Sequence, residues 1–197
     1  MRTTSRITAA LVSSLIAVGA TAASAHADTT TLRDKASDVL TFTDQTTDQR
    51  GTQLGYSQSK ESGLDLRSLR VKHTTRSVAI NLGFSRLGPD AVVAVSLRLD
   101  GKATPTRFLF SVGNGKARVT TPRGSNQCTV PLAVRLGDRG HVNAVIKRSC
   151  LGNPDRVKAS ALVSDEGLYG DNTPYTADAV SPSTVRGATW TKWLSPS

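Results

Sequence analysis

Apolar and polar residues alternate with a period of two along most of the chain after Gly63, and this pattern predicts strands rather than helices. Turn signals such as Asp100-Gly101 and Gly113-Asn114-Gly115 separate the alternating stretches. Beyond residue 27, no stretch keeps the period of about 3.6 residues that marks an amphipathic helix. About nine short strands at this spacing predict an all-β fold, an antiparallel β-sandwich or jelly roll.

The strongest hairpin signal lies between Cys128 and Cys150, where two alternating stretches flank a Gly-Asp-Arg-Gly turn. A turn centred on Arg139 places opposite each other the pairs Leu132–Ile146, Val134–Ala144, Leu136–Val142 and Cys128–Cys150. The apolar face and the cysteines then share one register, so we expect a single disulfide between Cys128 and Cys150. Two thiols alone make a poor metal site, and a catalytic thiol would not face a second cysteine.

Other stretches predict individual elements. Val39–Thr43 predicts a first strand because β-branched and aromatic residues dominate it. Gly51–Gly63 predicts a loop, with a short edge strand near residues 54–56. The next hairpin pairs residues 69–73 with 78–84, and the apolar phase changes at Arg67-Ser68, where we expect either a bulge or a strand that starts late.

The C-terminal part of the chain lacks this regularity. From about residue 165 to residue 197, glycines and prolines interrupt the sequence, so we expect an irregular segment packed on the sheets. Trp190 and Trp193 are expected to pin its end.

The first 27 residues predict a secretory signal peptide. Arg2 and Arg6 precede an apolar run over Ile7–Ala20, and Ala-Ser-Ala and Ala-His-Ala at residues 23–27 fit a cleavage site. The run is shorter than the roughly 20 residues of a spanning helix, and no second anchor is expected. Residues 28–197 then form a single secreted domain, and an oxidising compartment agrees with the predicted disulfide.

The chain has a formal net charge of +10. Outward positions of the predicted strands carry several of the cations, which keep the sheet faces hydrated and discourage edge pairing: Arg70, Lys72, Lys116, Arg118, Arg135 and Lys147. No nucleic-acid recognition motif accompanies them, so nucleic acid is not an expected partner. An anionic cell-wall polymer or a glycan is the expected partner of an exported basic surface.

Catalytic motifs are sparse. His73 shares an apolar face with Leu69 and Val71, and His141 abuts a turn glycine. Neither histidine has metal-ligand spacing, and no G-x-S-x-G elbow occurs in the chain. No catalytic residue is therefore assigned, and a secreted hydrolase or an enzyme inhibitor stays the alternative to a binding function.

Aspartates flank several predicted strands, among them Asp34, Asp38, Asp65 and Asp165. Carboxylates of this kind cap turns in most proteins, and they also supply the oxygen ligands that Ca²⁺ requires. No D-x-D-x-D-G loop is present to decide between these two interpretations.

Three stretches carry a resemblance: Asp34–Val39, Leu64–Thr74 and Arg148–Pro154. They resemble small secreted actinobacterial proteins of unassigned function. The layout from Asp34 to Val163 also resembles, more distantly, the β-sandwich of family-nine carbohydrate-binding modules and DOMON-like domains. This resemblance implies a non-catalytic sandwich that binds no cofactor except a structural Ca²⁺ at the early aspartates, Asp34, Asp38 and Asp65.

The sequence as a whole predicts a secreted, non-catalytic binding or interaction module of the cell envelope or extracellular space. Its aromatic contact candidates are Trp190, Trp193 and Tyr169, although large aromatic side chains more often pack in a core. A purely structural envelope protein is a third hypothesis. Retention on purified cell wall or on soluble glycans separates these functions.

Overall fold

The computed structural model describes residues 27–43, 51–102, 106–114, 116–120, 126–165, 174–180 and 189–197. The predicted signal peptide, except its last residue Ala27, and the contact candidate Tyr169 lie outside these ranges.

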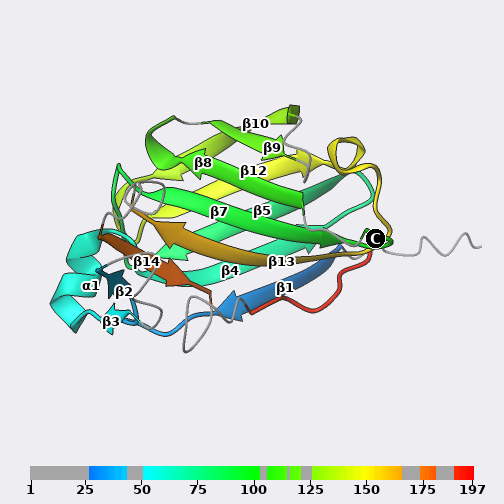
Figure 1. Ribbon diagram of the computed structural model, residues 1–197. Coiled ribbons are helices and arrows are strands. Elements are labelled where there is room, and N and C mark those ends of the chain that lie inside the picture. The colour runs from blue at the N-terminus through cyan, green and yellow to red at the C-terminus, as the bar shows by residue number, and fades with distance from the viewer. Residues whose placement is uncertain are drawn as a thin grey trace, which may run out of the picture.

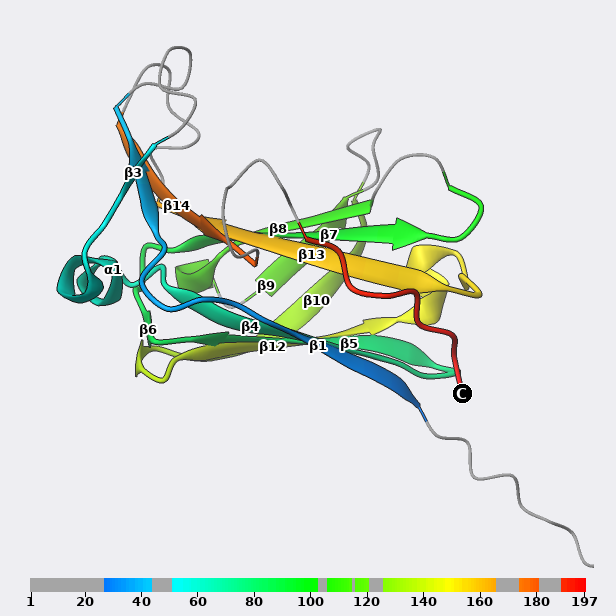
Figure 2. The same cartoon turned by 90° about the horizontal axis from the view of Figure 1, so that it is seen from below.

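The strands form two stacked layers, which Figure 2 shows edge-on, and every strand pair in the described residues is antiparallel. The first layer contains β1 (Asp28–Arg33), β4 (Leu66–His73), β5 (Ser77–Phe84) and β12 (His141–Lys147). The second layer contains β9 (Lys116–Thr120), β8 (Thr106–Ser111), β7 (Val92–Leu99), β13 (Val157–Ser164), β14 (Tyr175–Ala179), β2 (Leu40–Phe42) and β3 (Thr52–Gln53). The predicted all-β sandwich is confirmed (Figure 1).

Strand β10 (Asn126–Arg135) belongs to both layers. Its first half pairs with β9 as far as Pro131, and its second half pairs with β12 from Leu132 onward. The change of partner falls at Pro131, which has no N–H to donate to a ladder. The strand order therefore runs unbroken through twelve strands, although these strands lie in two layers.

The alternation predicted for the central strands produces the core. In β5, Val78, Ile80, Leu82 and Phe84 are buried, and the residues between them face outward. In β13, four small or β-branched residues are buried in the same way: Val157, Ala159, Ala161 and Val163. Side chains of both layers join in one apolar cluster, so the sandwich encloses a single core.

The predicted bulge and hairpin are confirmed. The β4–β5 register shifts between Leu66 and Ser68, where the apolar phase changes. Beyond the shift, Leu69 lies opposite Leu82 and Val71 opposite Ile80. In a regular strand, residues three apart face opposite sides of the sheet. The bulge inserts one extra residue into β4, so Leu66 and Leu69 both face the core.

The predicted register of the cysteine hairpin is wrong by two residues. Val134 lies opposite Val142, and Leu132 lies opposite Ala144. The turn differs because its residues form β11 (Gly137–Asp138), which pairs with β6 (Arg86–Leu87) in a separate ribbon.

A slip of two residues keeps each side chain on its original side of the sheet, so the inward face of β12 is still buried. Leu136 is the exception. It lies beyond the end of β10 and is 48% exposed, not packed on the predicted apolar face.

The disulfide between Cys128 and Cys150 is confirmed, with Cα atoms 5.8 Å apart. It is not the predicted cross-strand pair, because Cys128 lies opposite Val119 of β9. Cys150 lies in the 3₁₀ helix η2 (Arg148–Leu151), which follows β12. The bond therefore ties the half of β10 that belongs to the second layer to the end of a first-layer strand.

Several elements were not predicted, among them β1, β14 and the helix α1 (Tyr56–Ser62). The helix replaces most of the predicted loop, and the edge strand β3 lies just before the expected residues 54–56. Gln58 accepts a hydrogen bond from Gly55 at the start of α1, and Gly63 ends the helix with a φ of 73°. The sequence of α1 has no apolar stripe, because only Ser59 of this helix is buried. Hydrophobic periodicity therefore could not predict it.

Strand β8 ends at Ser111, and the 3₁₀ helix η1 (Val112–Asn114) follows where the sequence predicted a turn.

Replacing both Cys128 and Cys150 by alanine is expected to lower the free energy of unfolding by about 3 kcal/mol, because the bond closes a loop of 22 residues. Urea unfolding of the double variant, with the wild type under oxidising and reducing conditions, measures the change. Equal stability of all three forms would show that the bond does not hold the layers together.

Candidate functional site

Three carboxylates from distant parts of the chain converge beside the end of β14. Asp34 and Asp38 follow β1, and Asp178 lies in β14. One oxygen of each lies within 4.8 Å of the others, and Asp178 is only 2% exposed. Asp65 is buried nearby, but its Oδ1 accepts the backbone N–H of Ser37 at 3.0 Å. Asp34 and Asp38 are thus brought together as expected, with Asp178 as the third carboxylate.

Burial and neighbouring charge make Asp178 and Asp38 harder to ionise. Burial, followed by the charge of Asp34, raises the pKa of Asp178 to about 8. Two N–H donors oppose this rise: Leu66 N–H bonds to Oδ2 at 2.7 Å, and Ala179 N–H bonds to Oδ1 at 2.8 Å. Burial also raises the pKa of Asp38. At neutral pH, Asp178 therefore holds a proton.

The donor atoms at this cluster fit a hard cation, since Ca²⁺ prefers carboxylate oxygens. Asp34, Asp38 and Asp178 would hold such an ion. Asp65 would not contact the ion in this arrangement. It would hold the backbone at Ser37, between Asp34 and Asp38, through the hydrogen bond to its Oδ1. The Ca²⁺ site itself stays a prediction.

The C-terminal strap, residues 189–197, runs along the edge of β13 (Figure 2). Leu194 and Val157 exchange backbone hydrogen bonds of 2.8 and 3.0 Å, and Thr191 N–H bonds to Ala159 at 2.9 Å. Lys192 reaches Asp28 of β1 at 3.3 Å, so the strap bridges the two layers.

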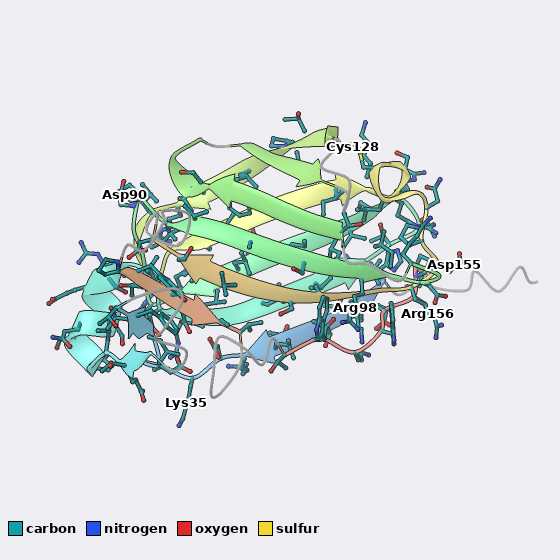
Figure 3. The ribbon with its side chains drawn as sticks, viewed as in Figure 1. Lys35, Asp90, Arg98, Cys128, Asp155 and Arg156 are labelled. Atoms are coloured by element: carbon teal, nitrogen blue, oxygen red, sulfur yellow. A yellow bond between two sulfur atoms is a disulfide. The ribbon has the colours of Figure 1, made fainter. Side chains whose placement is uncertain are left out.

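Trp190 and Trp193 lie on the strap, outside the apolar core, and alternate with three cations. Arg98 lies 4.7 Å and Lys158 5.7 Å from the ring centre of Trp190. Lys158 lies 5.0 Å and Arg156 5.4 Å from that of Trp193. Figure 3 shows Arg98 and Arg156 beside the strap. These contacts confirm that the tryptophans pin the chain end, while their role as ligand contacts stays a prediction.

The basic face is the outward side of β1, β4, β5, β12 and the second half of β10. Its exposed cations come from four of these strands: Arg33, Arg70, Lys72, Arg135 and Lys147. Strands β4, β5, β10 and β12 contain no Asp or Glu. Among the described residues, none of the five cations forms an ion pair.

The centre of the basic face is hollowed. A hollow of about 330 Å³ lies over β4, β5 and β12, lined by Arg70, Lys72, Ala79, Ile80, Asn81, Asn143, Ala144 and Val145. The register explains this grouping, because Arg70 lies opposite Asn81 and Asn81 lies opposite Asn143. Sequence analysis identified Arg70 and Lys72. It missed the two asparagines, whose outward positions were visible but whose pairing depends on strand order.

The histidines lie apart from each other. His73 is fully buried, and its Nδ1 donates a hydrogen bond of 2.9 Å to the carbonyl of Leu194. Burial lowers its pKa, so this side chain is neutral and supports the strap. His141 faces outward on β12, opposite Arg135.

None of the helices in the described residues is long and apolar enough to span a membrane. No protein-family model, curated protein or solved structure matches the chain, so the resemblance to carbohydrate-binding and DOMON-like sandwiches stays a prediction.

The free energy of unfolding of the wild type is expected to fall as the pH rises from 5 to 8. The variant Asp178→Asn is expected to show a smaller fall. The wild-type carboxyl has a pKa near 8 when folded and 3.8 as its ordinary value, so stability falls as pH rises through this range. Asn cannot ionise, so its stability should fall less over this range, by about 1 kcal/mol or more.

Urea unfolding at several pH values measures this difference, and the exposed Asp90→Asn is the matched control. Parallel curves for the wild type and Asp178→Asn would contradict a protonated Asp178. Repeating the titration with CaCl₂ tests the Ca²⁺ expectation, because a bound cation favours ionised carboxylates and would remove the fall with pH.

Proposed function

We propose that this protein is an extracellular, non-catalytic binding module that attaches to an anionic polymer through the basic face. The single observation that carries the proposal is the acid-free outer surface of β4, β5 and β12, on which the exposed cations have no ionic partner among the described residues. Unpaired cations on one rigid sheet attract and retain a polyanion.

Geometry strengthens the charge argument. Arg70 and Lys72 are two residues apart on β4, so their side chains leave the same side of the sheet about 6.8 Å apart. Lys147 on β12 and Arg135 on β10, two and three strands away from β4, extend the positive surface. Several weak contacts to successive anions of one polymer add up to useful retention, although each exposed charge contributes little.

The second group of cations, around the strap, is less suited to this role. Arg156 is paired with Asp100 at 3.0 Å and also lies against Trp193. Arg98 and Lys158 lie against the indole rings. These three side chains therefore hold the strap on β13, and we place the polymer on the opposite layer.

Reversing two charges at the hollow, Arg70→Glu with Lys72→Glu, is expected to lower retention on immobilised anionic polymer by about tenfold or more at low salt. The columns are polygalacturonate, polyphosphate and dextran sulfate, with neutral dextran as the blank. Retention of the wild type on the anionic columns should fall steeply with added NaCl, because charge-driven binding is screened.

The matched control is Arg86→Glu with Lys102→Glu, which changes the net charge equally at exposed positions outside the basic face. This control should lose far less retention than the β4 variant. Equal losses in the two variants, or wild-type retention equal to that on neutral dextran, would overturn the proposed function.

A further inference from the structure

The hollow at the centre of the basic face combines three kinds of surface within a short distance. Arg70 and Lys72 supply positive charge on the β4 side. Asn81 and Asn143 lie in the middle, and Ala79 with the 60% exposed Val145 supplies apolar surface. Its volume of about 330 Å³ reaches the lower end of the range of small-molecule pockets.

The two asparagines are oriented by each other. Asn81 Nδ2 donates a hydrogen bond to Asn143 Oδ1, which fixes both amide planes across β5 and β12. The pair leaves three groups for a ligand: the Nδ2 donors of Asn143, the Oδ1 acceptor of Asn81 and the second N–H of Asn81. Such an arrangement matches hydroxyl groups, each of which both donates and accepts.

We infer that the hollow binds one uronate unit of an acidic polysaccharide, an inference that rests on the proposed function. The carboxylate of the sugar lies toward Arg70 and Lys72, since a guanidinium and a carboxylate form paired, charge-assisted hydrogen bonds. The hydroxyls meet Asn81 and Asn143, and the C–H face of the ring covers Val145. Each of the three surfaces of the hollow then has a partner on one sugar ring.

Other polyanions use only part of this surface. A polyphosphate chain satisfies the cations but has no hydroxyl for the amides and no apolar face for Val145. A sulfated polymer carries more negative charge per unit than a uronate polymer. Binding that depends on charge alone does not need hydrogen bonds to Asn81 and Asn143. The amide pair therefore distinguishes a uronate from an anion bound by charge alone.

The test compares the mature wild-type chain with Asn81→Ala/Asn143→Ala on polygalacturonate, polyphosphate, dextran sulfate and neutral dextran at one ionic strength. The double variant keeps every charge of the basic face. We expect its affinity for polygalacturonate to fall about tenfold, the effect of roughly 1.4 kcal/mol of lost hydrogen bonding, with little change on polyphosphate. Thermal unfolding verifies that both proteins are folded.

A second readout uses monomeric galacturonate in an NMR titration, with glucose as the neutral control. Galacturonate should shift the side-chain amide signals of Asn81 and Asn143, and glucose should not. Tighter binding to polyphosphate than to polygalacturonate, an unchanged affinity of the asparagine variant, or unmoved amide signals would each overturn the uronate assignment. The proposed function has its own test. It is contradicted if the wild type shows no charge-dependent retention on any of the anionic columns.

Discussion

The structure depends on the apolar core that two antiparallel layers enclose, and on the one strand that both layers share. β10 leaves the ladder with β9 and enters the ladder with β12 at Pro131, a residue that cannot donate a backbone hydrogen bond. Hydrogen bonding is therefore continuous through both layers, and the Cys128–Cys150 bond fastens the same region covalently. Sliding one layer over the other would break the ladder of β10 and open the core.

The packed core also fixes the positions of the side chains on the outer surfaces of the layers. The inward positions of β4, β5 and β12 are committed to the core, so their side chains hold the backbone at fixed strand spacing. The outward positions then present Arg70, Asn81 and Asn143 in a row across three strands. A row of this kind can contact successive units of one extended polymer, which is what the proposed function requires.

The sequence was informative where a residue's role depends on its immediate neighbours. Alternation predicted the β4–β5 hairpin, and the phase change at Arg67-Ser68 marked the bulge. The cysteine pairing was predicted correctly from a register that was wrong by two residues, because compartment and cysteine count carry most of that inference. Asp178 and the asparagine pair were missed because their partners are fixed by strand order. No local pattern records that Asp178 meets Asp34, or that β5 lies beside β12.

The tryptophans of the strap lie against Arg98, Arg156 and Lys158, and Arg156 is also paired with Asp100. The five cations of the basic face, in contrast, are exposed to solvent. These two groups of described cations therefore differ in how much of their charge is open to a partner. A matrix in contact with β4, β5 and β12 would leave Trp190 and Trp193 on the far layer. The chain end, in contrast, reaches the first layer, where Ser195 N–H bonds to Asp28 of β1, so a fusion or label placed at the C-terminus would lie beside the contact surface (Figure 2).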